Sequence, residues 1–160
     1  MAPYTMKINI NNPVTEITYV ASARLSGDGY VTATGNNIPA RTTSTGASLA
    51  KGGGHEGLFI ATFFAVHGCA KNLLVWSSMS AKSDGKVIVL IAFVDSHTSI
   101  TSIPNLCYND PSALGLTDGK VQASGVINGN GVTFTVTLAG YDTTYPDATA
   151  TLTTEIFAVA

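Results

Sequence analysis

The sequence predicts an all-β fold, a mostly antiparallel β-sandwich of nine to eleven short strands with little helix. Charged residues make up only 11% of the 160 residues, whereas long surface helices depend on them for solubility. Thr, Val and Ile suit a pleated, half-buried surface, and Gly and Asn punctuate the chain at turn positions. Because no fixed-period repeat or linker-like stretch divides the chain, residues 1–160 are expected to form one domain.

The first half of the chain alternates short apolar runs with turn residues. The Asp28-Gly29 pair favours a hairpin turn because both residues tolerate positive φ. Residues 39–48 are polar and are predicted to be loop. Residues 58–67 are apolar on both faces, so they are predicted to form a central strand that is covered on both sides. The strands expected here are residues 4–10, 14–25, 30–34, a brief 48–51, and 58–67.

The second half contains the clearest hairpin signal, Asn128-Gly129-Asn130-Gly131. Residues 110–115 are predicted to form one helical turn, with Asp110 as cap and Pro111 at the first position. Residues 141–147 are predicted to be loop. The strands expected in this half are residues 73–78, 86–94, 120–127, 132–139 and 148–159.

Charge and hydropathy exclude several classes of protein. The net charge is −2 and the eight Lys and Arg residues are scattered, so no basic field is present to bind nucleic acid. The amino-terminal residues do not have the basic region and apolar stretch of a secretory signal, and no apolar run is long enough to span a bilayer. The expectation is a cytoplasmic protein, or one released to act outside the cell.

Motifs for catalysis and metal binding are weak. His55, His67 and His97 do not have the spacing of a metal site, and no Gly-x-Ser-x-Gly element is present. We therefore expect a non-catalytic protein without metal or cofactor. Cys69 and Cys107 are interpreted as small apolar residues, and the alternative of a disulfide between them stays open.

The polar residues favour binding of a neutral ligand. Hydroxyl and amide groups are abundant, and several aromatic residues are predicted near loops. Sugar hydroxyls are met by such groups, with an aromatic ring under the apolar face of the sugar, and a phospholipid head group is met by a similar set. The candidate aromatic platform comprises Trp76, Tyr108 and Tyr141.

Residues 45–94 resemble a known family. Thr45-Gly46-Ala47-Ser48-Leu49, Phe59-Ile60-Ala61-Thr62-Phe63 and Val66-His67 look like the core of the fungal fruit-body lectins. Ser78-Met79-Ser80 with Asp84-Gly85-Lys86 resembles the pore-forming branch of the same actinoporin-like superfamily. The resemblance implies an actinoporin-like β-sandwich that binds galactosyl or N-acetylated sugars of glycoproteins.

The resemblance also implies a set of ligand-binding residues. In the lectins the strand-end His is followed by Asn-Tyr-Lys-Arg-Trp, whereas His67 is followed here by Gly68-Cys69-Ala70-Lys71-Asn72. An amide and an aromatic ring are thereby lost, and Lys71 and Asn72 are the substitutes. The implied sugar-binding residues are Thr45, Gly46, Ser48, His67, Gly68, Lys71 and Asn72.

Three functions follow, of which a sugar-binding lectin comes first. The alternatives are a membrane-lipid binder or pore-forming cytolysin of the same fold, and a self-assembling structural or storage protein. Pore formation by an inserted amino-terminal helix is disfavoured because residues 1–10 are few and alternate as a strand. A dimer or tetramer is expected, because a surface so poor in charge leaves apolar area to cover.

Overall fold

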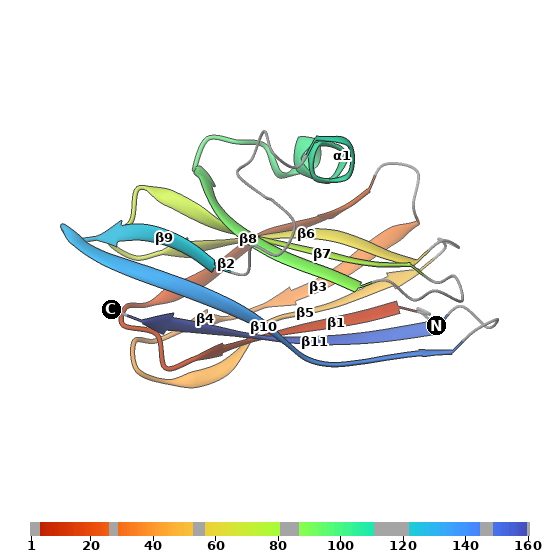
Figure 1. The fold of residues 1–160 in the computed structure, drawn as a ribbon, viewed down its shortest axis with the longest axis horizontal. Helices are drawn as coiled ribbons and strands as arrows, with labels where there is room; N and C mark the ends of the chain where they lie inside the picture. Colours follow the sequence, from red (N-terminus) through yellow and green to blue (C-terminus); the bar gives the residue numbers. More distant parts are fainter. Residues whose placement is uncertain are drawn as a thin grey trace.

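Two stacked β-sheets form the protein in a computed structural model, which describes residues 4–25, 29–52, 57–80, 87–110, 122–144 and 149–159 (Figure 1). The six-stranded sheet has the order β3-β5-β1-β11-β10-β9, and the five-stranded sheet the order β4-β2-β6-β7-β8. This architecture confirms the all-β sandwich predicted from the sequence. The strands are β1 (Tyr4–Asn11), β2 (Ile17–Arg24), β3 (Tyr30–Gly35), β4 (Asn37–Ile38), β5 (Thr43–Gly52), β6 (Gly57–Val66), β7 (Lys71–Ser80), β8 (Val87–Asp95), β9 (Gln122–Ile127), β10 (Asn130–Thr144) and β11 (Thr149–Val159).

The first and last strands lie side by side in the middle of the six-stranded sheet. β1 pairs with β11 in parallel and with β5 antiparallel, and the remaining neighbours of both sheets are antiparallel. In β1 the buried side chains are Tyr4, Met6, Ile8 and Ile10, which alternate with exposed or half-buried residues. The period of two places the first set against the other sheet and leaves the second set on the outer face.

The two faces of β6 belong to two different apolar clusters. Phe64 packs in the cluster between the sheets, whereas Phe63 belongs to a second cluster with Trp76 and Ile103. That second cluster lies on the outer face of the five-stranded sheet, beneath η1 (Ile100–Ser102) and α1 (Ile103–Asn109) (Figure 1). The prediction of a central strand covered on both faces is therefore confirmed.

Two segments predicted to be loops are strands. Residues 39–48 were expected to be loop, but β5 begins at Thr43 and pairs with β1 on one side and β3 on the other. Residues 141–147 were also expected to be loop, but β10 continues to Thr144 and pairs with β11. In β5 the polar side chains of Thr43, Thr45 and Ser48 lie on the outer face. A polar sequence can therefore form a strand, because pairing satisfies its backbone groups.

A short helix that the sequence did not predict, α1, ends immediately before Asp110, which is its carboxyl-terminal cap. The helical turn expected over residues 110–115, with Asp110 as its amino-terminal cap, falls beyond Asp110 on residues that are not described. Pro104 occupies the first turn of α1, where its missing N–H is tolerated. Ile103 and Cys107 are four residues apart and are both buried on the outer face of the five-stranded sheet. Residues 111–121 lie outside the described residues.

The predicted hairpin between β9 and β10 is confirmed. Ile127 pairs with Asn130, and the two residues between them, Asn128 and Gly129, have φ angles of 50° and 82°. Positive φ at both central residues is characteristic of a type I′ turn, whose twist matches that of the flanking strands. Among the described residues, no helix is long and apolar enough to cross a membrane.

Candidate functional site: a cleft at one end of the sandwich

Three connections meet at the end of the sandwich where β1 and β6 finish. They are residues 12–16 between β1 and β2, residues 39–42 between β4 and β5, and the β9–β10 hairpin. Backbone hydrogen bonds hold the first two together, from Asn12 N to Thr42 O at 3.1 Å and from Arg41 N to Pro13 O at 2.7 Å. A third, from Asn128 N to Gly68 O at 3.1 Å, fixes the hairpin to the β6–β7 connection.

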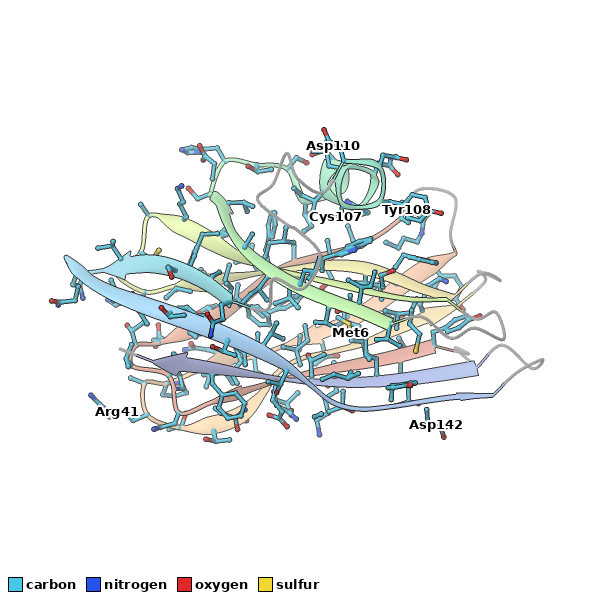
Figure 2. The ribbon with its side chains drawn as sticks, viewed as in Figure 1. Met6, Arg41, Cys107, Tyr108, Asp110 and Asp142 are labelled. Carbon is cyan, nitrogen blue, oxygen red and sulfur yellow. The ribbon has the colours of Figure 1, made fainter. Side chains whose placement is uncertain are left out.

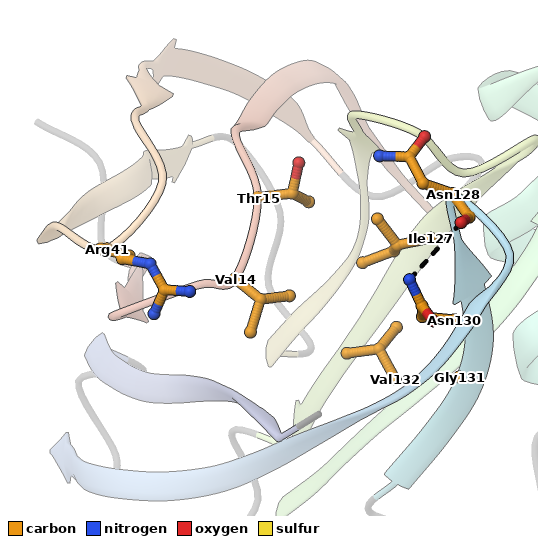
Figure 3. A pocket seen from close by; sticks show the side chains of 8 residues that line it. All are labelled: Val14, Thr15, Arg41, Ile127, Asn128, Asn130, Gly131 and Val132. Atoms are coloured by element: carbon orange, nitrogen blue, oxygen red, sulfur yellow. Dashed lines mark hydrogen bonds between the residues drawn. The ribbon is translucent and has the colours of Figure 1, made fainter.

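A cleft of about 570 Å³ lies between these connections (Figure 3). This volume is within the range of small-molecule binding sites. The floor is apolar, because Ile127 and Val132 are buried and Val14 is half-buried. The rim is polar. Arg41 lies on one side of the cleft and faces the β9–β10 hairpin on the other side, which carries the exposed Asn128 and Asn130. The residues that line the cleft are Val14, Thr15, Arg41, Ile127, Asn128, Asn130, Gly131 and Val132.

Arg41 is the charged residue of the cleft and has an unusual backbone. Its φ angle is 63°, which a residue with a Cβ adopts only when its surroundings impose it. The hydrogen bond from its N–H to Pro13 O holds this conformation. The side chain is exposed, and within the part of the chain that the structure describes its guanidinium has no hydrogen-bond or ion-pair partner. Its five N–H donors are therefore available to a ligand.

Two of the predicted site residues, His67 and Gly68, support the wall of the cleft from behind. Thr15 Oγ1 donates a hydrogen bond to His67 O at 3.1 Å. Gly68 has a φ angle of +85°, and a Cβ at this position would lie 2.8 Å from Oδ1 of Asn128. The positive φ favours glycine at this position, and the hydrogen bond from Asn128 N to Gly68 O holds the tip of the hairpin.

The other predicted residues lie on different surfaces from His67. The side chains of Thr45 and Ser48 lie on the outer face of the six-stranded sheet, and Thr45 Oγ1 donates to Asn9 Oδ1 at 3.0 Å. Gly46 is buried at a β-bulge, where an added Cβ would lie 3.0 Å from the ring of Phe64. His67 follows the last residue of β6 in the five-stranded sheet.

Hydrogen bonds along the rim of the sandwich link the Thr45 backbone to His67. Asn36 Nδ2 donates to Thr45 O at 3.0 Å, and the next residue, Asn37, donates from Nδ2 to Glu16 Oε2 at 3.2 Å. Glu16 O in turn accepts from His67 N at 2.9 Å. These bonds connect the backbone groups of Thr45 and His67 through Asn36, Asn37 and Glu16, and none of them involves the side chain of Thr45 or His67. Lys71 is exposed and Asn72 half-buried at the start of β7, and neither lines the cleft.

The predicted aromatic platform is dispersed. Trp76 is buried beneath α1 with only 4% of its surface exposed, so its ring is not available to a ligand, contrary to the prediction. Tyr108 is exposed on α1 and packs edge-to-face on Phe59 at 5.8 Å between ring centroids. Tyr141 is exposed on β10, in the six-stranded sheet, whereas α1 lies on the five-stranded sheet; Figure 2 labels the next residue, Asp142.

The two cysteines are free and lie on opposite faces of the five-stranded sheet. Cys69 packs against the cluster between the sheets, and Cys107 belongs to the cluster beneath α1. The disulfide between Cys69 and Cys107 that the sequence left open is therefore not formed. Burial raises the pKa of the Cys107 thiol to about 12. In the described part of the chain, no group of three or more His, Cys, Asp or Glu residues is arranged to hold a metal ion; His55 and residues 84–86 lie outside it.

The residues of the cleft were not identified from the sequence. Arg41, Thr15, Asn128 and Asn130 come from three connections, and the sequence indicates only that each belongs to a turn or loop. One signal was present, since Arg41 is one of only two arginines in the chain and follows Pro39 in a polar stretch. The role of a residue at such a position can be recognised only when its neighbours in space are known.

No protein-family model matches the chain, and no curated protein sequence matches it. Eleven chains of solved structures do match. One of them is the lipid-binding protein Nakanori, with a TM-score of 0.62, 11% sequence identity, and coverage of 98% of this chain and 71% of that one. At this identity the likeness shows a shared fold.

Proposed function

We propose that this protein is a non-catalytic binding protein that attaches to membranes by holding a phospholipid head group in the end cleft. The observation that carries the proposal is the exposed Arg41 guanidinium at the rim of a cleft whose floor is apolar. A solved structure with the same fold, Nakanori, is a lipid-binding protein, which supports this choice of ligand.

The polar rim and the apolar floor of the cleft match the phosphate and the carbon atoms of a phospholipid head group. The phosphate diester of the head group can accept two parallel hydrogen bonds from the Arg41 guanidinium. Such paired bonds between opposite charges are among the strong hydrogen bonds that an arginine makes. The exposed amides of Asn128 and Asn130 add neutral donors on the opposite side. The carbon atoms of the head group would contact Ile127, which is buried, and Val14, which is half-buried.

The test is sedimentation with vesicles of phosphatidylcholine, and with the same vesicles containing sphingomyelin or phosphatidylserine. We expect binding to at least one composition, and a loss of about tenfold in affinity for Arg41→Asn, which removes the charge while tolerating positive φ. Arg41→Lys should keep part of the affinity, because it retains the charge and loses the planar pair of donors. Soluble glycerophosphocholine should compete if the head group is the ligand.

Lys7→Thr is the matched control, since it removes one exposed cation from β1 outside the cleft. Equal losses for Lys7→Thr and Arg41→Asn would reduce the interaction to general electrostatics and contradict the proposal. Folded protein that binds none of the three vesicles would contradict it as well. Leakage of trapped dye separates simple attachment from the pore-forming alternative.

Sugar binding through Thr45, Ser48 and His67 stays a prediction from the resemblance. Assembly into a dimer or tetramer, and a cytoplasmic location, also stay predictions from the sequence. Sedimentation velocity at several protein concentrations tests the assembly.

A further inference from the structure

A second, smaller cleft lies along the edge of β2. Within the described residues β2 pairs with β4 only at Ile17 and Thr18, so the rest of β2 is an edge of the five-stranded sheet. The cleft at this edge has a volume of about 320 Å³, which is at the lower end of the range of small-molecule sites. The residues that line this side cleft are Ser22, Ala23, Arg24, Val31 and Thr101.

Arg24 places a positive charge in the side cleft. Its side chain is half-buried, and its Nη1 donates a hydrogen bond to Leu25 O at 3.1 Å. In the described part of the chain its guanidinium has no ion-pair partner. Because a guanidinium has five N–H donors, most of them stay available to a ligand. A half-buried charge has lost part of its hydration, so binding of an anion at this position is favoured.

Two hydroxyl groups line the cleft together with the guanidinium. Ser22 lies two residues before Arg24 on the same face of β2, and its Oγ is 3.0 Å from Oγ1 of the fully buried Thr62. A buried hydroxyl needs a partner for its proton, so Thr62 donates and the proton of Ser22 stays free for a ligand. Thr101 is exposed, and its Oγ1 exchanges a hydrogen bond with Ser99 Oγ at 2.9 Å.

The donors of the side cleft match a phosphate group. A guanidinium pairs with two oxygens of a phosphate, and a monoester has a third oxygen that accepts from a hydroxyl. In the part of the chain that the structure describes, no carboxylate lines the cleft to repel an anion. The half-buried Ala23 and Val31 reduce the access of water, which strengthens charge-assisted hydrogen bonds.

We infer that the side cleft binds the phosphate group of a phosphate monoester through Arg24, Ser22 and Thr101. The site is separate from the end cleft, because β2 starts two residues after Thr15 and extends for about 20 Å to Arg24. The inference therefore does not depend on the proposed lipid function.

The test is a nuclear magnetic resonance titration of the folded protein with inorganic phosphate, and with phenyl phosphate as a monoester, at constant ionic strength. We expect saturable shifts centred on the backbone amides of Ser22 and Thr101 and on the Nε–H of Arg24. Absence of saturable shifts with both compounds, or equal shifts with sodium chloride, would overturn the inference. Shifts centred on Arg41 and Asn128 would also overturn it, because they would place the phosphate in the end cleft.

Substitutions then test the roles of the guanidinium and the hydroxyl. Arg24→Gln should weaken phosphate binding by about tenfold or more, because it removes the charge-assisted hydrogen bonds. Arg24→Lys should keep part of the affinity, since it retains the charge and loses the planar pair of donors. Thr101→Val should weaken binding several-fold. Unchanged affinity in Arg24→Gln would overturn the inference, and unchanged affinity in the exposed Thr101→Val does so if Arg24→Gln does not fold.

Vesicles distinguish the two sources of a phosphate monoester. Sedimentation with phosphatidylcholine vesicles that contain phosphatidic acid should be equal for the wild type and Arg24→Gln if the ligand is a soluble compound. A loss in Arg24→Gln would assign the site to a lipid phosphate.

Two controls separate this site from other effects. Lys7→Thr removes an exposed cation outside both clefts and should leave phosphate binding unchanged. Arg41→Asn should lose vesicle binding and keep phosphate binding. Because the two assays depend on different arginines, failure of the side cleft and failure of the end cleft are distinguishable.

Discussion

At the scale of single residues, the interior of the sandwich contains a polar group that the fold does not use. Thr154 of β11 is fully buried, and its hydroxyl has no hydrogen-bond partner among the described residues. A buried hydroxyl without a partner costs free energy because it has lost its hydrogen bonds to water. We therefore expect Thr154→Val, which keeps the shape, to raise the free energy of unfolding by about 1 kcal/mol. Urea denaturation of the two proteins measures the difference, and a clear loss of stability would show that the hydroxyl is hydrogen-bonded in solution.

Cys107 gives the stability of the protein a dependence on alkaline pH. Its thiol has a pKa of about 12 in the folded protein, raised from 9.0 by burial. Below pH 9 the thiol is protonated in both the folded and unfolded states, so it causes no pH dependence. Between pH 9 and 12 only the unfolded state releases the proton, and the free energy of unfolding falls. Urea denaturation at pH 8 and near pH 10 should show a smaller fall for Cys107→Ala than for the wild type; equal falls would contradict the pKa shift.

At the scale of elements, the short helix is a structural part of the sandwich. Ile103 of α1 is fully buried against the outer face of the five-stranded sheet, whereas Leu106 on the same helix is 37% exposed. We expect Ile103→Ala to lower the free energy of unfolding by about 2–4 kcal/mol, since it removes buried methyl groups and leaves a cavity. Leu106→Ala is the matched control and should cost much less. Similar losses for the two variants would indicate that α1 does not pack as described.

The elements also show how far the sequence determines this fold. The strands with alternating or continuous apolar residues, such as β1 and β6, could be predicted because burial imposes their pattern. The β9–β10 hairpin could be predicted because Asn128-Gly129 satisfies positive φ. β5 and the end of β10 could not be predicted, because their polar segments become strands through pairing with distant strands and not through a local pattern. β5 pairs with β1 and β3, and the end of β10 pairs with β11.

At the scale of the whole molecule, both proposed sites are products of topology. The end cleft joins residues 14, 41 and 128, and the side cleft joins β2 to η1 and to β3 of the other sheet. Such sites have no local signature, so the sequence could not indicate their positions. Two residues that the resemblance implied make contacts across connections and strands: Gly68 O accepts from Asn128 N, and Thr45 Oγ1 donates to Asn9 Oδ1. Their sugar-binding role stays a prediction.

If the end cleft holds a phospholipid head group as proposed, we expect the protein to attach to vesicles as a rigid body. The cleft lies at one end of the sandwich, whereas Trp76, the single tryptophan, is buried under α1 on the outer face of the five-stranded sheet. Because vesicle binding through the cleft leaves the packing of α1 unchanged, the emission maximum of Trp76 and its protection from acrylamide should stay the same when vesicles are added. A change that appears with vesicles in the wild type and is absent in Arg41→Asn would instead show that binding displaces the helix. The same measurement on Ile103→Ala, in which α1 packs more weakly, provides the reference for an exposed Trp76.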